Sequence, residues 1–349
     1  MSLSLRITRN LKLNHAKITL SSNTQRYRKM SSLIPGSNTF NPDKDIPDLS
    51  GKHYIVTGGS AGIGFGIAAH LLQHKADNVT ILSNKEEHAQ SALEELKEYG
   101  DASKAHWVKC DFEDLKFTEK VANELARSQD KLDGLVLNAG LGVGVYNETK
   151  DKIDSHFQVN ILSQFLLLKK LLPRLQKTPG SRLVFESSDL HKAADGGAQF
   201  KDEAEINNDI GPTQLYNRTK LALILLARAL QRRKEAGELG FQPGQSVFIN
   251  AVHPGAVATD QQLQAEEAYG TLGVVGHAIV RPFLKDPVSQ GCRPALFATT
   301  SKEIEEQEIS GQYIVPDKKV TSPSSKAQDD ELGERLWNLM EQMLKDRLG

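Results

Sequence analysis

The sequence has 349 residues, of which 39% are hydrophobic and 25% are charged, and its formal net charge is −1. That length and composition suit one large globular domain with a single core. No stretch approaches the roughly 18 consecutive apolar residues of a membrane-spanning helix. The only cysteines, Cys110 and Cys292, lie far apart and outside any metal-binding spacing. This excludes a disulfide framework or a zinc motif and favours a reducing compartment.

The first 42 residues differ in charge from the rest of the chain. They hold seven Lys or Arg and no Asp or Glu, so residues 43–349 carry a net charge of −8. A body this acidic lacks the basic footprint of a nucleic-acid-binding protein. Residues 1–29 are basic and Ser-rich, which is typical of a mitochondrial transit peptide, a disordered tail, or an extension upstream of a start at Met30. We exclude residues 1–42 from the fold and expect a cytoplasmic protein, or a mitochondrial one if residues 1–29 act as a transit peptide.

From His53 onward, short β-branched runs alternate with helical patterns. Strands are expected at 53–57, 79–83, 106–110, 134–138, 182–187, 247–252 and 312–315, and helices at 63–74, 86–99, 115–127, 151–176 and 213–236. This alternation predicts an α/β fold, in which residues 43–349 form a single Rossmann-type domain with a doubly wound, mostly parallel, seven-stranded sheet and helices on both faces. Ligands bind such sheets at the carboxyl ends of the strands. Segments 191–212 and 259–287 follow strands, so they are either walls of a substrate pocket or surface insertions.

A glycine-rich turn follows the first expected strand. In TGGSAGIG, residues 57–64, Gly58 permits a sharp turn, while Gly62 and Gly64 let the backbone approach a pyrophosphate at a helix N-terminus. No GK[ST] follows, so a nucleotide triphosphatase loop is disfavoured.

The ends of the next two strands bear on the choice of cofactor. The second strand ends at Ser83, Asn84 and Lys85, where an NAD site usually carries Asp or Glu for the ribose hydroxyls. Hydrogen-bonding groups beside a cation suit a 2′-phosphate better, so NADP(H) is favoured over NAD(H), unless Lys85 is simply an exposed residue at a helix start. After the third strand, Asp111 either reads an adenine amino group or caps the following helix.

Several motifs in a fixed order together resemble a known family. Tyr216 and Lys220, one helical turn apart in YNRTK, would alone be a surface pair. With the other motifs they resemble the classical short-chain dehydrogenase/reductase family, and the motifs are TGGSAGIG, Asp111, Asn138-Ala139-Gly140, Asn160, Ser188, the Tyr216/Lys220 pair and HPGAVAT (253–259). The later segments RPFLKDPVSQG, SGQYIVPDK and ERLWNLMEQML are similar to its retinol dehydrogenase and WW-domain oxidoreductase-like branch.

The resemblance implies roles for individual residues. The family's catalytic four correspond to Asn160, Ser188, Tyr216 and Lys220. The cofactor contacts expected, including Lys85 from the argument above, are Gly58, Gly62, Ile63, Gly64, Lys85, Asp111, Asn138, Ala139, Gly140, Tyr216, Lys220 and Thr259. Glu186, just before the serine pair, is unusual in an apolar strand.

These groups fit hydride chemistry between nicotinamide and a carbonyl. A proton must move at the oxygen as hydride moves at the carbon, and a tyrosine with a pKa of about 10 needs a nearby positive charge to serve near neutral pH. Lys220 and the oxidised nicotinamide are expected to supply it, Ser188 to hold the oxygen, and Asn160 to hold a water that links Lys220 to solvent. No metal is expected.

The sequence therefore predicts an NADP(H)-dependent oxidoreductase that interconverts a ketone or aldehyde and its alcohol. Apolar residues in segment 259–287 favour an apolar small-molecule substrate. Two alternatives stay open: a regulatory or scaffold protein that binds the cofactor without turnover, and a sugar-nucleotide epimerase, which shares the Tyr/Lys pair but is disfavoured by PGAVAT. The helices after Asn160 and Tyr216 are broadly apolar, so they either pack inside one chain or form a homodimeric helix bundle, which the resemblance favours.

Overall fold

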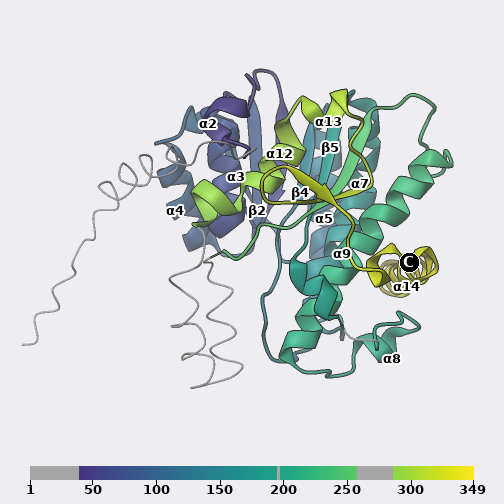
Figure 1. Ribbon diagram of the computed structural model, residues 1–349. Coiled ribbons are helices and arrows are strands. Elements are labelled where there is room, and N and C mark those ends of the chain that lie inside the picture. Colours follow the sequence, from purple (N-terminus) through teal and green to yellow (C-terminus); the bar gives the residue numbers. More distant parts are fainter. Residues whose placement is uncertain (1–38, 195–196, 258–285) are drawn as a thin grey trace, which may run out of the picture. The chain divides into compact units, whose positions relative to one another are not determined.

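The computed structural model describes residues 39–194, 197–257 and 286–349. At its centre lies a sheet with the strand order β3-β2-β1-β4-β5-β6-β7-β8 (Figure 1). All pairings are parallel except that of β8, which runs antiparallel to β7. The strands are β1 (His53–Thr57), β2 (Asn78–Ser83), β3 (Ala105–Lys109), β4 (Gly134–Leu137), β5 (Ser181–Glu186), β6 (Val247–Val252), β7 (Gln312–Val315) and β8 (Lys319–Thr321). The order reverses between β1 and β4, which is where doubly wound sheets open a ligand crevice.

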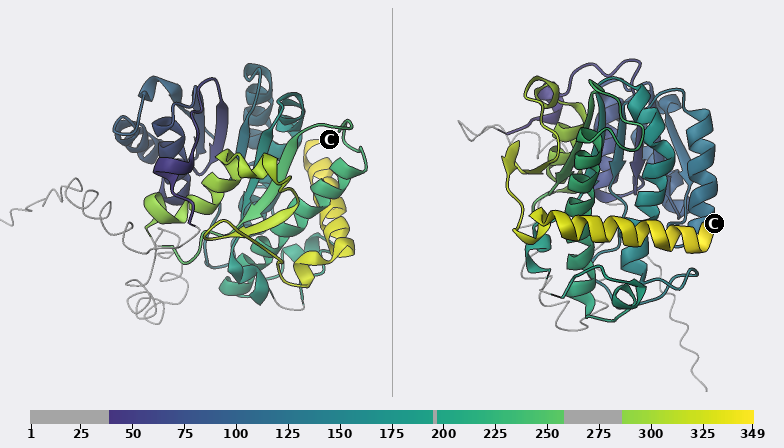
Figure 2. Two further views of the ribbon diagram at one scale, coloured as in Figure 1. Left: turned by 45° about the horizontal axis from the view of Figure 1, so that its top comes forward. Right: turned by 90° about the vertical axis from the view of Figure 1, so that its right-hand side faces the viewer.

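Helices cover both faces of the sheet (Figure 2). On one face α3 and α12 contribute to a buried apolar cluster, and on the other α5, α7, α9 and α14 contribute to a second one. The helices are α2 (Pro42–Asp45), α3 (Gly62–Gln73), α4 (Glu86–Leu96), α5 (Leu115–Ser128), α6 (Ser155–Phe157), α7 (Ser163–Lys177), α8 (Glu203–Ile206), α9 (Pro212–Glu235), α12 (Arg293–Thr300), α13 (Glu303–Glu306) and α14 (Asp330–Leu348). None of the helices in these described parts has the length and apolar character to cross a bilayer.

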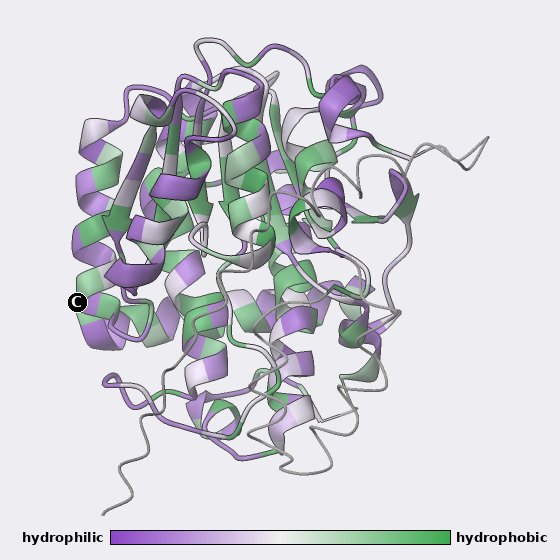
Figure 3. Ribbon diagram, turned by 90° about the vertical axis from the view of Figure 1, so that its left-hand side faces the viewer, coloured by the Kyte–Doolittle hydropathy of each residue, from purple (hydrophilic) through white to green (hydrophobic). Residues whose placement is uncertain are grey.

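Strand β5 contributes apolar side chains to both buried clusters, one on each face of the sheet. All six of its residues are buried. Because side chains alternate across a strand, Leu183 and Phe185 join the cluster beneath α7 and α9, while Val184 joins the cluster beneath α3 and α12. A strand buried on both faces reads as a continuous apolar run, and Figure 3 shows apolar residues along the central strands.

The described residues form an eight-stranded sheet, so the prediction of seven strands is wrong by one. The additional strand, β8, has only three residues, two of them exposed, and follows a tight turn in which Asp317 and Lys318 have positive φ angles of 68° and 58°. A short, polar edge strand carries no apolar alternation, so its sequence gives no strand signal. The Rossmann-type α/β class is confirmed.

The long helix expected at 151–176 is divided. Asp154 accepts a hydrogen bond from the backbone N–H of Phe157 and starts α6, and a π-helical turn over Gln158–Leu162 then leads into α7. The π turn places Asn160 at an irregular point of the helix, and such turns are frequent at functional sites.

The apolar surfaces of α7 and α9 are covered within one chain. Helix α14 packs against α9 and α5 and crosses this side of the molecule (Figure 2). Trp337 of α14 meets the ring of Phe165 edge-on, with 4.8 Å between ring centroids, and Arg233 of α9 lies 4.0 Å from the Trp337 ring centroid. The apolar composition of α7 and α9 therefore does not by itself call for a second subunit.

Candidate active site

The glycine turn lies between the end of β1 and the start of α3. Gly58 and Gly62 have φ angles of 66° and 54°, in the region that favours glycine. A Cβ added to Gly64 would lie 2.3 Å from the carbonyl oxygen of Gly58, so the helix start and the turn touch through backbone atoms. No side chain caps the N-terminus of α3 at Ala61. Its backbone N–H groups are therefore suited to donate to a phosphate, and Ile63 lies in this first turn.

Thr57 connects the glycine turn to the loop after β4. Its hydroxyl oxygen accepts hydrogen bonds from the backbone N–H groups of Asn138 and Ala139, both at 2.9 Å, and its hydroxyl donates to Gln164 at 3.1 Å. The Asn138 side chain donates to the Thr57 carbonyl oxygen at 2.9 Å. Sequence reasoning placed Asn138 and Ala139 at the cofactor but missed Thr57.

At the ends of β2 and β3, some of the predicted cofactor residues are exposed, whereas others form hydrogen bonds within the protein. Ser83 is buried and accepts a hydrogen bond from the indole N–H of Trp107 at 3.0 Å, whereas Asn84 and Lys85 are exposed. Asp111 accepts from the backbone N–H of Glu113 at 3.1 Å, and the N-cap of α5 is Asp114. The capping interpretation of Asp111 is therefore wrong, because a residue three positions later takes that place.

The structure brings Ser188, Tyr216 and Lys220 together at the carboxyl end of β5. Ser188 follows β5, and its hydroxyl lies close enough to the Tyr216 phenol to lower the pKa of that group. Lys220, one turn along α9, holds its ammonium 5.4 Å from the centroid of the Tyr216 ring. The Lys220 ammonium donates to the carbonyl oxygen of Glu186 at 2.8 Å, and the Ser187 hydroxyl donates to the Lys220 carbonyl oxygen at 2.7 Å. Glu186 and Ser187 thus hold Lys220 in place.

In this cluster the pKa of the Tyr216 phenol is raised rather than lowered. Burial raises the pKa of Tyr216, the neighbouring Ser188 side chain lowers it, and the charge of Glu186 raises it further. Burial also lowers the pKa of Lys220. Without a bound cofactor, the Tyr216 phenol is therefore protonated at neutral pH.

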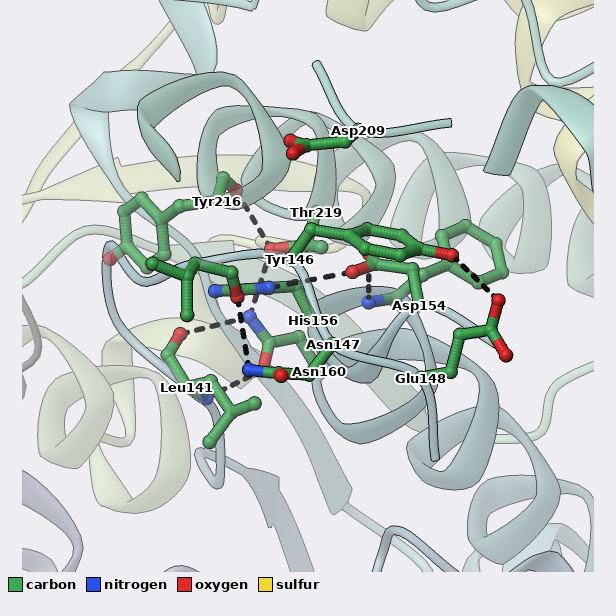
Figure 4. A network of polar contacts seen from close by, with 12 residues as sticks. Leu141, Tyr146, Asn147, Glu148, Asp154, His156, Asn160, Asp209, Tyr216 and Thr219 are labelled. Atoms are coloured by element: carbon green, nitrogen blue, oxygen red, sulfur yellow. Dashed lines mark hydrogen bonds and ion pairs between the residues drawn. The ribbon is translucent and has the colours of Figure 1, made fainter. Parts of the chain in front are cut away.

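Asn160 ties three parts of the site to one another (Figure 4). Its side-chain oxygen accepts from the Leu141 N–H at 2.7 Å, and its amide group donates to the Leu141 carbonyl oxygen at 3.1 Å and to the Thr219 hydroxyl at 2.9 Å. That hydroxyl donates to the Tyr216 carbonyl oxygen at 2.8 Å. A Cβ on Gly140 would lie 3.1 Å from the Asn160 side-chain oxygen, so glycine leaves room for this contact. The water link from Asn160 to Lys220 stays a prediction.

Known proteins share this arrangement of motifs. Residues 52–199 match the sequence profile described as short chain dehydrogenase. The chain is 37% identical over 324 residues to bli-4 of Neurospora crassa, named as a mitochondrial oxidoreductase, covering 89% of this chain and 76% of that protein. The chain belongs to the short-chain dehydrogenase/reductase family.

Within this family, the human retinol dehydrogenase 14 is 30% identical over 318 residues, covering 85% of this chain and 87% of that protein. The structure of Pseudomonas aeruginosa RhlG with NADP matches with a TM-score of 0.57 at 22% identity, covering 77% of this chain and 95% of that one. The resemblance to the retinol dehydrogenase-like branch is therefore confirmed, and the protein is a short-chain dehydrogenase/reductase that uses a nicotinamide cofactor.

The residues present fit such a cofactor. In this dehydrogenase/reductase the uncapped start of α3 offers backbone donors for the pyrophosphate. Gly58 lies so close to Ala139 that no side chain fits between them, so the surface of the turn there is backbone.

Thr259 and most of segment 259–287 lie outside the described residues. Segment 191–212 contains α8, whose preceding residue, Asp202, accepts from the backbone N–H of Glu205 at 2.8 Å.

Replacing Asn160 with Ala should lower the free energy of unfolding by about 2–4 kcal/mol, because a buried side chain loses three hydrogen bonds, one of them fully buried. NADPH affinity should fall as well, since the Leu141 loop follows the Asn138 segment. Urea unfolding and NADPH fluorescence titration measure the two effects. Asn250→Ala is the matched control, because Asn250 makes two hydrogen bonds between β6 and residues leading into β7. A loss of stability with equal NADPH affinity in both variants would contradict a role for Asn160 in the site.

Proposed function

We propose that this dehydrogenase/reductase interconverts an apolar ketone or aldehyde and the corresponding alcohol with NADP(H), and that Tyr216 is its general acid and base. One observation carries the proposal: Lys220 lies one turn from Tyr216 on α9, with its ammonium 5.4 Å from the centroid of the Tyr216 ring, and Ser188 follows β5 in the sheet that bears the glycine turn. A hydroxyl donor, a phenol and an ammonium at one point are what proton transfer to a carbonyl oxygen requires.

Each side chain has a separate task in reduction. When bound, NADPH supplies the hydride that adds to the carbonyl carbon. Ser188 donates a hydrogen bond to the carbonyl oxygen and stabilises its developing negative charge. Tyr216 gives its proton to that oxygen, which completes the alcohol and leaves a phenolate. The Lys220 ammonium stabilises this phenolate until it takes a proton back from solvent.

The protonation state of Tyr216 favours reduction in this scheme. Burial raises the pKa of the phenol, so it carries its proton throughout the neutral range and is ready to act as an acid. Oxidation of an alcohol needs the phenolate instead, and therefore rises with pH. This supports reduction as the main direction with NADPH.

We further propose that Lys85 binds the 2′-phosphate of NADP(H), supported by its exposure at the end of β2 and by the NADP that RhlG binds. Lys85→Glu should weaken NADPH binding at least about tenfold and leave NADH binding nearly unchanged, since only NADPH has the extra phosphate. Fluorescence titration with both cofactors measures this. Lys97→Glu at the other end of α4 is the control. Equal losses for NADPH and NADH would show that Lys85 does not read the phosphate.

The proposed substrate class is an apolar carbonyl compound, supported by the retinol dehydrogenase among the relatives. The test is a screen of lipid, terpenoid, polyketide-like and retinal-type carbonyls with purified protein, followed by the absorbance of NADPH. Oxidation of NADPH by at least one apolar carbonyl is expected. If NADPH binds tightly but no carbonyl oxidises it, the regulatory interpretation replaces this proposal.

We also propose that residues 1–29 direct the protein to mitochondria, supported by their basic, Ser-rich composition and by the mitochondrial name of bli-4. The native protein is then expected in isolated mitochondria with a shortened N-terminus. Mass spectrometry of that N-terminus tests the proposal, and an intact residue 1 in mitochondrial protein would contradict it.

A further inference from the structure

His191 is a buried histidine in the turn that follows Ser188, and the mechanism above does not use it. This turn is the short 3-10 helix η3 (Asp189–Ala193), and the His191 side chain is only 1% exposed. Its ring nitrogen Nδ1 lies 2.7 Å from the carbonyl oxygen of Ser188, and Nε2 lies 3.0 Å from the backbone nitrogen of Ser324. Ser324 stands between β8 and α14. The imidazole therefore bridges the turn after Ser188 and the segment that leads into the C-terminal helix.

The two partners of the ring decide which of its nitrogens carries the proton. A carbonyl oxygen can only accept, so Nδ1 must be protonated, and a backbone N–H can only donate, so Nε2 must be unprotonated. Burial lowers the pKa of His191 and Lys192 lowers it further, against the Ser188 carbonyl and Asp189, which raise it. The net lowering favours the neutral ring, the form that makes both hydrogen bonds.

Other elements pack against the same turn. Tyr313 of β7 meets the His191 ring edge-on, with 5.1 Å between ring centroids, and its hydroxyl donates to Asp189 at 3.1 Å. On α9, which packs against η3, the side-chain amide of Asn217 donates to the carbonyl oxygen of Ala193 at 3.3 Å. Contacts from β7, from α9 and from the segment before α14 thus hold this turn together.

Three hydrogen bonds from the turn converge on Ser188. The backbone N–H and the ring Nδ1 of His191 both donate to the Ser188 carbonyl oxygen, at 3.1 Å and 2.7 Å. The backbone N–H of Leu190 donates to the Ser188 hydroxyl oxygen at 3.2 Å. Because that oxygen already accepts a hydrogen bond, the hydroxyl is oriented to donate its own hydrogen elsewhere. Ser188 is half-buried, so the hydroxyl is held in place without being closed off.

We propose that His191 is a positioning residue for reduction: its imidazole, protonated on Nδ1, holds the Ser188 turn against Ser324 and thereby fixes the Ser188 hydroxyl where it meets the substrate carbonyl. The bridge and the tautomer rest on the structure alone, whereas the effect on reduction rests on the proposed function. Loss of the bridge leaves the glycine turn and Lys220 untouched. It should therefore slow the chemical step without weakening NADPH binding.

The tautomer is tested first, by NMR of the imidazole nitrogens in the full-length protein with isotope-labelled histidine at neutral pH. The ring signals that disappear in His191→Phe identify this residue. A protonated Nδ1 and an unprotonated Nε2 are expected, because only this form suits both partners. A ring protonated on Nε2 alone, or on both nitrogens, would overturn the proposal.

The effect on reduction is tested with His191→Phe and His191→Asn, using NADPH and a retinal-type aldehyde as the probe. Phe keeps an aromatic ring and loses both hydrogen bonds, whereas Asn keeps an N–H donor as far along the side chain as Nδ1. In His191→Phe, kcat should fall about tenfold to a hundredfold, the scale of a small misplacement of a reacting group. KM and NADPH affinity should stay within about twofold of wild type. His191→Asn should recover most of the lost kcat.

His70→Phe is the matched control. His70 is also buried, and its ring nitrogens lie 3.1 Å from the side-chain oxygen of Gln73 and 3.2 Å from the carbonyl oxygen of Val288. This variant should unfold at lowered urea, as His191→Phe does, but keep wild-type kcat. Equal losses of kcat in both variants, or a loss of NADPH affinity in step with kcat in His191→Phe, would overturn the positioning role. If wild type reduces no carbonyl, the proposed function fails, and the NMR measurement alone upholds or overturns the bridge.

Discussion

Tyr216→Phe should lower the rate of carbonyl reduction by about a hundredfold to ten-thousandfold, the contribution of a positioned general acid. The change removes only the phenolic hydroxyl, and the ring stays buried in α9. NADPH affinity should remain within about twofold of wild type, because the glycine turn and the Thr57 hydrogen bonds are untouched. The measurement is kcat/KM for the best carbonyl of the screen, together with fluorescence titration of NADPH.

Tyr54→Phe is the matched control for this substitution. Tyr54 is also buried, and burial raises its pKa too, but it lies near the amino end of β1 and far along the strand from the glycine turn. It should keep nearly full activity. If Tyr216→Phe retained as much activity as Tyr54→Phe, another group would have to donate the proton, and the assignment of Tyr216 would be wrong.

Gly64→Ala should abolish tight NADPH binding and destabilise the fold. The added Cβ would lie 2.3 Å from the Gly58 carbonyl oxygen and 2.6 Å from the side-chain nitrogen of Asn138, and the first of these atoms belongs to the backbone and cannot rotate away. The turn and α3 must separate, at a cost of about 1–3 kcal/mol typical of overpacking. Because the same backbone would receive the pyrophosphate, NADPH affinity should fall by at least about tenfold.

Gly333→Ala tests whether an added methyl group elsewhere has the same effect. Gly333 lies in α14, and its nearest neighbour would be the end of the flexible Arg232 side chain at 3.2 Å. This variant should bind NADPH normally and unfold at the same or higher urea, since Ala favours helix more than Gly. Wild-type NADPH affinity in Gly64→Ala would contradict the assignment of this turn to the pyrophosphate.

The candidate site shows which features can be predicted from sequence. Ser188, Tyr216 and Lys220 were predicted from the family resemblance, because they occur with the other motifs in a fixed order. Thr57 was missed because threonine at a strand end is common, and its four polar neighbours come from β4, the loop after β4 and α7, more than 75 residues away along the chain. The π turn at Asn160 was missed because residues 153–168 are all buried, so the segment shows no amphipathic period that the turn could interrupt. The short β8 was missed because its three residues show no alternation of apolar and polar side chains.

By itself, the sequence determined the parallel α/β architecture, the glycine turn after β1 and the order of the reactive residues, because these depend on local periodicity and on residue type. Only the tertiary structure decided that Lys220 bonds to the backbone of Glu186, that Asn160 is tied to Leu141 and Thr219, and that α14 covers α9. These contacts join elements far apart in the chain. Burial, which raises the pKa of Tyr216 and lowers that of Lys220, exists only once those elements have packed.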